Sequence, residues 1–204
     1  MNSQPLIPFL TALSGLSQPF VAERNQWLIQ HGKHFRAAAV LLAIVPHQGQ
    51  WHILLTRRAD TLRHHTGQIA LAGGRQDPED LDLTATALRE AHEEIGTPPS
   101  IWHTFAPITT YYTPSGYAIA PIPAFCSCEP LVSPNADEVA EVFYVPLQFA
   151  LNAHNYQWRH FEHYGKALLM PELPYRHYPI WGVTAAILYA LAELHRQQPL
   201  LLPQ

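Results

Sequence analysis

Apolar residues recur along the chain either in continuous runs or at helical spacing. Residues 37–45 are apolar throughout, which is typical of a buried strand. A second apolar stretch, residues 51–56, follows a Gly-containing turn at residues 48–50. Because two such stretches joined by a short turn pair with each other, they predict a β-hairpin.

Helical spacing predicts three helices. One covers residues 84–95 and ends at Gly96, and its apolar side carries Ala87, Leu88, Ala91 and Ile95. A last helix follows Pro179, with apolar residues at three- and four-residue steps: Ile180, Val183, Ile187, Leu191 and Leu194. We expect this stripe and Trp181 in the core, with a subunit interface as the alternative. A further helix is expected over residues 20–30.

The middle of the chain is rich in proline and differs in this from the predicted helices. Nine of the 19 prolines lie between residues 98 and 146, which excludes long helices there and favours short strands and loops. Strands and helices together predict an α/β domain with a mixed sheet between helices. A length of 204 residues suits one domain, which we place at residues 36–196, after a helical N-terminal extension (1–35) and before a C-terminal tail (197–204).

Composition and charge exclude several classes of function. Hydrophobic residues make up 48% of the chain, which excludes general disorder, and a formal charge of −4 gives no field that attracts nucleic acid. The longest apolar runs, 9 and 13 residues, are shorter than the roughly 18 to 20 residues that cross a bilayer. The first residues do not resemble a secretory signal. We therefore expect a cytoplasmic protein with neither a nucleic-acid nor a membrane partner.

Cysteine and histidine give little sign of a soft-metal site. The two cysteines, Cys126 and Cys128, stand in an apolar context, and a disulfide between them would be strained, so we expect reduced core residues. The thirteen histidines lack the companion ligands and spacings of a zinc site.

A carboxylate cluster on the 84–95 helix is the main candidate for chemistry. Glu90, Glu93 and Glu94 fall on one arc of the helix, where Glu90 and Glu94 repel each other and the helix dipole disfavours negative charge. Arg89 can reach Glu93 but cannot neutralise all three. A hard divalent cation such as Mg²⁺, bound by carboxylates together with substrate phosphates, would compensate them. A solvated acidic helix face is the alternative at this point.

The sequence around this cluster carries a family resemblance. A loop with a Gly pair, Gly73 and Gly74, leads into the helix, and the segment from Gly74 to Thr97 resembles the box that defines the Nudix hydrolases. Its intact core is Arg89-Glu90-Ala91-His92-Glu93-Glu94-Ile95-Gly96. Three features depart from the family pattern: Asp80 is the first acid, it stands one residue further from Arg89, and Ala91 and Thr97 replace bulky aliphatic residues.

A second resemblance lies upstream and indicates a branch of the family. Residues 54–74 are similar to the signature of the coenzyme A diphosphatases, and the longer box also occurs in that branch. The positions that match in register are Thr56, Ala59, Arg63, Gly67, Gly73 and Gly74. Arg58 replaces a Thr of the signature, and Leu71-Ala72 replace Phe-Pro.

The resemblance implies a fold, a reaction and a set of site residues. The fold would be an α/β/α sandwich, and the reaction would cleave the diphosphate of coenzyme A or a derivative to 3',5'-ADP and 4'-phosphopantetheine. Glu90 and Glu94 would hold Mg²⁺ or Mn²⁺, with Glu93 as a further ligand or proton acceptor. Phosphate and diphosphate groups of the substrate would be bound by Arg58, Arg63, Gly73 and Gly74. Outside the box, Glu138 is the candidate general base, with a surface role as the alternative.

Two other functions stay open. One is a Nudix diphosphatase that acts on ADP-ribose, dinucleotides or nucleoside triphosphates, which the replaced Phe-Pro allows. The other is a silent domain that binds a nucleotide as a sensor, although three carboxylates without a metal would repel such a ligand. Metal-dependent turnover distinguishes these classes. In each case the partner is a small molecule, and a homodimer is among the assemblies that the sequence allows.

Overall fold

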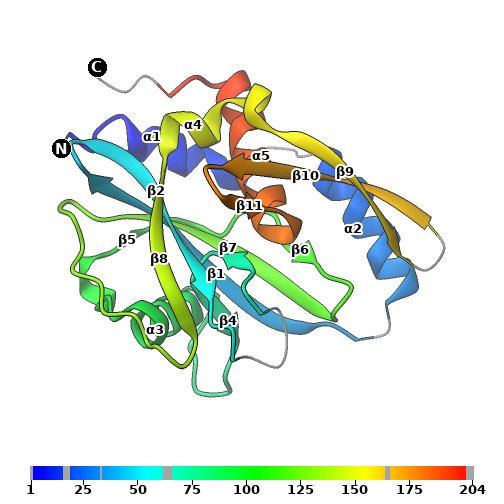
Figure 1. The fold of residues 1–204 in the computed structure, drawn as a ribbon, viewed down its shortest axis with the longest axis horizontal. Coiled ribbons are helices and arrows are strands. Elements are labelled where there is room, and N and C mark those ends of the chain that lie inside the picture. Colours follow the sequence, from blue (N-terminus) through cyan, green and yellow to red (C-terminus); the bar gives the residue numbers. More distant parts are fainter. Residues whose placement is uncertain (1, 16–18, 33, 62–65, 164–165, 201–204) are drawn as a thin grey trace.

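Helices cover both faces of a large mixed β-sheet (Figure 1). The computed structural model describes residues 2–15, 19–32, 34–61, 66–163 and 166–200. The large sheet contains β1 (Arg36–His47), β2 (Gln50–Arg58), β3 (Ile69–Ala70), β4 (Gly73–Arg75), β5 (His103–Thr104), β6 (Tyr111–Tyr112), β7 (Tyr117–Phe125) and β8 (Val139–Pro146). A smaller antiparallel sheet contains β9 (Gln157–His163), β10 (Lys166–Tyr175) and β11 (Tyr178–Ile180).

Helices precede, interrupt and follow these strands. The α-helices are α1 (Leu6–Ala12), α2 (Pro19–His31), α3 (Leu83–Ile95), α4 (Leu147–Leu151) and α5 (Gly182–Gln197). Short 3-10 helices are η1 (Leu13–Gly15), η2 (Pro99–Ile101) and η3 (Ala153–Asn155). The helices expected over residues 20–30 and 84–95 are confirmed as α2 and α3.

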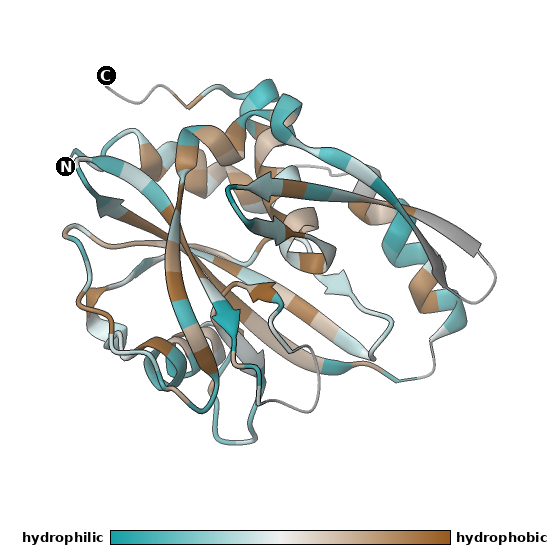
Figure 2. Ribbon diagram, in the orientation of Figure 1, coloured by the Kyte–Doolittle hydropathy of each residue, from teal (hydrophilic) through white to brown (hydrophobic). Residues whose placement is uncertain are grey.

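The continuous apolar run of β1 is explained by burial on both faces. On one face Leu41 and Ala43 pack in a core with α3, and on the other Leu42 and Ile44 pack in a core with α1, α4 and α5. Colouring by hydropathy shows the apolar residues along the central strands (Figure 2). The expected α/β/α arrangement with a mixed sheet is therefore confirmed: β1 runs parallel to β7 and antiparallel to β2.

The predicted hairpin opens at one end of the sheet. β1 and β2 pair only near their turn, from Ile44 to His47 and from Gln50 to Ile53. Further along, β4 pairs with β1, whereas β3 pairs with β2. The chain between β3 and β4 thus occupies the opening, and this is where the cavity described below begins.

Two sequence expectations are wrong in detail. Ile180 belongs to β11 and not to the last helix, which begins at Gly182. Cys126 is buried as expected, but Cys128 is exposed, because the strand ends at Phe125 and the chain turns so that the Cys126 thiol donates to the Cys128 carbonyl. Both cysteines are free. In the described part of the chain, no helix is long and apolar enough to cross a membrane.

Candidate active site

Local sequence signals fix both ends of α3. The Asp82 carboxylate accepts a hydrogen bond from the Ala85 N–H at 2.7 Å and caps the first turn. Gly96 ends the helix in the left-handed conformation with φ of 73°, and its N–H donates to the His92 carbonyl. The small side chains of Ala87 and Ala91 are fully buried, which lets the helix approach the sheet closely.

The three glutamates of α3 lie in different surroundings, which corrects the expectation that they face one place. The side chain of Glu94 is 5% exposed, that of Glu90 is 15% exposed, and that of Glu93 is 51% exposed. A turn of about 100° per residue separates Glu93 from Glu94 by about a quarter of the helix circumference. Glu94 therefore faces the sheet, Glu93 faces solvent, and Glu90 lies between them.

Glu94 is a buried carboxylate that is held by a backbone donor. The Gly73 N–H donates to its Oε2 at 3.1 Å, and the Arg58 guanidinium lies 3.6 Å from its Oε1. Burial raises the pKa of Glu94 to about 7, and the negative charges of Glu90 and Glu138 add to the rise. The Gly73 N–H and the Arg58 charge act in the opposite direction but do not offset the effect of burial.

Glu90 lies directly against the glycine pair. A Cβ atom added to Gly74 would stand 2.5 Å from the Glu90 carboxyl group, and one added to Gly73 would overlap the backbone of Ala39 and Val40. Both glycines are therefore required by close approach of β4 to β1 and to α3. The pKa of Glu90 is raised by burial first, and the charges of Glu93 and Glu138 contribute to the rise.

The Arg89 guanidinium donates hydrogen bonds to three carboxylates, and Asp80 holds it in place. Its Nε and Nη2 donate to Asp80 at 3.0 and 2.9 Å, and its Nη1 donates to both Glu90 and Glu93 at 3.0 Å. Asp80 also accepts from the Thr86 hydroxyl and the Asp77 N–H. The hydrogen bond from Arg89 is the main cause that holds the pKa of Asp80 far below the ordinary value, and these two contacts add to it. The reach of Arg89 to Glu93 is confirmed. Despite its shifted spacing, Asp80 orients the arginine of the box.

Glu138 and Arg58 complete the surroundings of the acid cluster. The backbone of Asn135 donates to the Glu94 carbonyl at 2.9 Å, and the Asn135 side chain donates to the Glu138 carboxylate at 3.3 Å. These contacts bring the segment before β8 alongside the end of α3. Arg58 stands at a register shift in the β2–β8 pairing, and its guanidinium is shared between Glu94 and the cavity wall.

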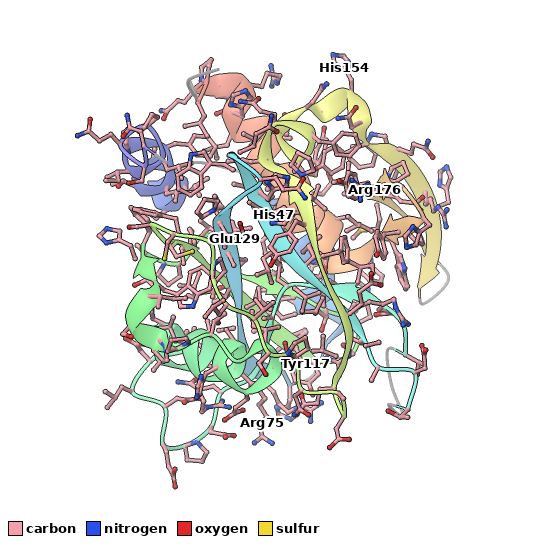
Figure 3. All side chains as sticks on the ribbon, turned by 60° about the vertical axis from the view of Figure 1, so that its left-hand side comes forward. His47, Arg75, Tyr117, Glu129, His154 and Arg176 are labelled. Atoms are coloured by element: carbon pink, nitrogen blue, oxygen red, sulfur yellow. The ribbon has the colours of Figure 1, made fainter. Side chains whose placement is uncertain are left out.

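A cavity of about 560 Å³ begins at the glycine pair and extends between the strands and α2. Its wall is mainly apolar, with contributions from Val40, Leu71, Ile119, Met170 and Val183. Charged or polar side chains stand at its margins: Arg24, Arg58, Arg75, Thr113, Ser115 and Tyr117. Figure 3 shows Arg75 and Tyr117 at the same end of the molecule. A volume in this range suits a small organic ligand.

The structure brings most of the predicted site residues to this region and adds others. Gly73, Gly74 and Arg58 line the cavity, whereas Glu90 and Glu94 lie behind the glycine wall. Arg63 lies outside the described residues. Trp181, expected in the core, is only half-buried and lines the cavity. Arg24, Arg75 and Tyr117 were not predicted as site residues, because only the tertiary fold brings them here.

The carboxylates fit a hard cation by chemistry, although their present positions pair them with protein groups. Among the residues that the structure describes, no three His, Cys, Asp or Glu side chains lie at metal-binding spacing. Arg89 stands between Glu90 and Glu93, and Glu94 is turned to the Gly73 N–H. The donors are oxygen atoms only, and two of the carboxylates, the half-buried Glu90 and the buried Glu94, have raised pKa values. This set fits Mg²⁺ or Mn²⁺ and not zinc.

Comparison with known proteins gives the family. The sequence profile of the NUDIX domain matches residues 34–164. A protein of Yersinia pestis (strain Pestoides F), named Uncharacterized Nudix hydrolase NudL, is 37% identical over 170 residues, which cover 81% of this chain and 85% of that protein. The chain belongs to the NUDIX family. It is therefore a Nudix hydrolase, and hydrolases of this family generally use divalent ions such as Mg²⁺ or Mn²⁺.

Solved structures agree with the Nudix fold. The M. Smegmatis Nudix hydrolase RenU superposes with a TM-score of 0.56 at 22% identity, over 84% of this chain and 92% of that one. A Nudix hydrolase from Alicyclobacillus acidocaldarius gives a TM-score of 0.50 at 20% identity, over 84% of this chain and all of that one. At these identities the likeness concerns the fold alone.

Proposed function

We propose that this Nudix hydrolase cleaves the diphosphate bond of coenzyme A or a close derivative, which yields 3',5'-ADP and 4'-phosphopantetheine. The observation that carries the proposal is the position of two carboxylates, the half-buried Glu90 and the buried Glu94, directly behind the Gly73–Gly74 wall of a long cavity. A diphosphate against this wall would lie next to the acid cluster, and the rest of the substrate would extend along the cavity.

Glu90, Glu93 and Glu94 are the residues that we assign to the metal. The chemistry that a bound Mg²⁺ or Mn²⁺ supplies is charge neutralisation on the diphosphate and acidification of the attacking water. These side chains would hold the ion as carboxylates. Asp80 accepts two hydrogen bonds from Arg89 and so keeps its guanidinium beside these carboxylates.

The reaction itself is a hydrolysis at one of the two phosphorus atoms. A water oxygen forms a bond to that phosphorus, the bond from it to the bridging oxygen breaks, and the bridging oxygen leaves with the other phosphate. We assign the water proton to Glu138, whose charge contributes to the raised pKa values of Glu90 and Glu94. Glu93 is the alternative acceptor.

The choice of coenzyme A rests on the upstream signature and on the cavity. The signature residues Arg58 and Gly73 line the cavity. Its apolar wall, with Leu71, Met170 and Trp181, suits the uncharged pantetheine arm better than a second nucleotide. We assign Arg58 and Arg63 to substrate phosphates, Arg63 on the strength of the signature alone. The cytoplasmic location and the division at residues 35 and 196 stay predictions.

A product screen tests the proposal. Coenzyme A, ADP-ribose, a dinucleoside tetraphosphate and a nucleoside triphosphate are incubated separately with the protein and Mg²⁺ or Mn²⁺, and the products are identified by mass spectrometry. We expect coenzyme A to give 3',5'-ADP and 4'-phosphopantetheine at the highest kcat/KM. Preferential cleavage of another substrate would replace coenzyme A with that substrate class, and binding without turnover of any of them would favour a sensor.

Arg63→Ala refines the screen. We expect its KM for coenzyme A to rise by roughly ten- to a hundredfold with little change in kcat, since a charge-assisted hydrogen bond to substrate is lost from ground and transition states alike. A fall in kcat with unchanged KM would show that Arg63 acts in the chemical step.

A further inference from the structure

Arg24 of α2 is a buried cation that faces the cavity without a counter-charge. The residue is 8% exposed and lines the same cavity as the glycine pair. Its Nη1 atom has no hydrogen-bond partner, and no carboxylate forms an ion pair with it among the residues that the structure describes. The site proposed above does not use this residue.

Hydrogen bonds of the adjacent residue hold Arg24 in place. The Asn25 side chain donates to the Thr110 carbonyl and accepts from the Tyr112 N–H. These two hydrogen bonds to backbone groups attach α2 to the β6 edge of the sheet. One turn after Arg24, Leu28 lines the same cavity. This packing keeps the middle of α2 at the cavity.

An unpaired charge at this depth is costly, because desolvation disfavours it. Burial lowers the pKa of Arg24 to about 10, so the side chain stays a cation at neutral pH. The nearby phenol of Tyr111 does not balance the charge: its own pKa is raised by burial, and it is neutral at neutral pH. Arg24 thus presents a buried cation to the cavity, where an anionic group of a ligand would supply a counter-charge.

The strand order separates Arg24 from the carboxylate side of the cavity. β4 pairs with β1, β1 with β7, and β7 with β6, to which Asn25 binds α2. Three spacings of about 4.8 Å place β6 about 14 Å from the glycine pair on β4. Arg24 therefore reaches the cavity from the side of β6, whereas the carboxylates lie on the side of β4.

We propose that Arg24 binds a second phosphate group of the substrate, separate from the diphosphate that is cleaved. This deepens the proposed function and rests on it: in coenzyme A the group is the 3'-phosphate of the ribose. ADP-ribose and dinucleoside polyphosphates carry no phosphomonoester of this kind. The N-terminal helix α2, which has no motif of the family, thereby selects among diphosphate substrates.

The test is a calorimetric binding measurement without metal, so that it does not depend on turnover. Adenosine 3',5'-bisphosphate and AMP are titrated into the wild-type chain, Arg24→Met and Arg24→Lys. Arg196→Met makes the same chemical change on the exposed end of α5 and serves as the matched control. We expect wild type and the control to bind the bisphosphate about ten- to a hundredfold more tightly than AMP, from one charge-assisted contact.

Arg24→Met should remove this preference without weakening AMP binding, and Arg24→Lys should restore part of it. Equal losses for both ligands, or an unchanged preference, would overturn the assignment. Turnover of coenzyme A is measured in parallel. If coenzyme A is cleaved and the preference does not depend on Arg24, the inference fails while the proposed function stands. If the preference depends on Arg24 and coenzyme A is not cleaved, the inference stands while the proposed reaction fails.

Discussion

Two arginines stand in opposite electrostatic surroundings: Arg89, which lies behind β4, and Arg24, which lines the cavity. Arg89 donates to Asp80, Glu90 and Glu93, and these carboxylates raise its pKa. Arg24 has no carboxylate partner in the described part of the chain, and burial lowers its pKa. One side of the cavity thus has more buried negative charge than its cations balance, and the other has a positive charge without a balance. Such a cavity suits a ligand that brings a cation to the first side and an anion to the second.

The largest effect on turnover is expected when a carboxylate of the acid cluster, Glu94, is replaced. Glu94→Gln should lower kcat for coenzyme A about a hundredfold or more, because the amide cannot replace a carboxylate as metal ligand. The Gly73 N–H can still donate to the amide oxygen, so the fold should be as stable or slightly more stable. Steady-state kinetics at saturating Mg²⁺ and thermal unfolding measure the two effects.

A matched variant makes this result specific. Glu129→Gln removes a carboxylate from an exposed ion pair with His47, which lies well apart from the labelled cavity residues Arg75 and Tyr117 (Figure 3). It should leave kcat unchanged. Near-normal turnover of Glu94→Gln would remove Glu94 from the metal site.

Loss of the ion pair between Arg89 and Asp80 should lower the stability of the fold more than it lowers turnover. Asp80→Ala leaves Arg89 without its main partner, and we expect a loss of about 2 kcal/mol in the free energy of unfolding. Turnover should fall about tenfold or less, far less than for Glu94→Gln. Denaturant unfolding measures the stability, and Asp60→Ala, which breaks the exposed pair with Arg57, should cost less than about 1 kcal/mol. A kinetic loss as large as that of Glu94→Gln would make Asp80 a direct participant.

Stability should depend on pH through Glu94 when no metal is present. Its pKa is about 7 in the folded chain and about 4.5 when unfolded, so the folded state binds the extra proton between these values. The free energy of unfolding should therefore rise as pH falls from about 7 to 4.5, by about 2 kcal/mol relative to Glu94→Gln. The difference between the two proteins is measured in a chelator at several pH values, which cancels the titration of shared histidines. A constant difference would show that Glu94 is ionised throughout.

The smallest effect is expected at the unpaired arginine. Arg24→Met removes a buried charge, and the melting temperature of the ligand-free protein should rise by about 2 to 4 °C, as about 1 kcal/mol of stabilisation gives in a chain of this size. Arg196→Met should change it by less than a degree. A lower melting temperature for Arg24→Met alone would show that Arg24 has a favourable partner in the ligand-free chain.

The parts of the molecule that sequence predicts are those with local causes. The apolar run of β1, the turn at Gly49 and the end of α3 at Gly96 depend on neighbouring residues, and each is found where it was predicted. The short strands β3 and β4 were missed because they form only where β1 and β2 separate. Cys128 and Trp181 were misplaced because their burial depends on where a strand or helix ends.

The candidate site also contains residues that the sequence predicts and residues that only the tertiary fold brings together. The box of residues around Glu90 is marked by spacing, although spacing does not show that Glu94 is buried while Glu93 is exposed. Arg24 has no sequence signal, because its burial arises when Asn25 attaches α2 to β6, and β6 stands nearly 90 residues later in the chain.

The most direct test of a cavity with two charged sides compares coenzyme A with 3'-dephospho-coenzyme A as substrates of the unaltered protein. The two molecules share the diphosphate and differ only in the phosphate that we assign to Arg24. We expect both to be cleaved with similar kcat, and KM for coenzyme A to be lower by about tenfold or more. Equal KM values, or cleavage of neither substrate in the presence of Mg²⁺ or Mn²⁺, would contradict this assignment of the cavity.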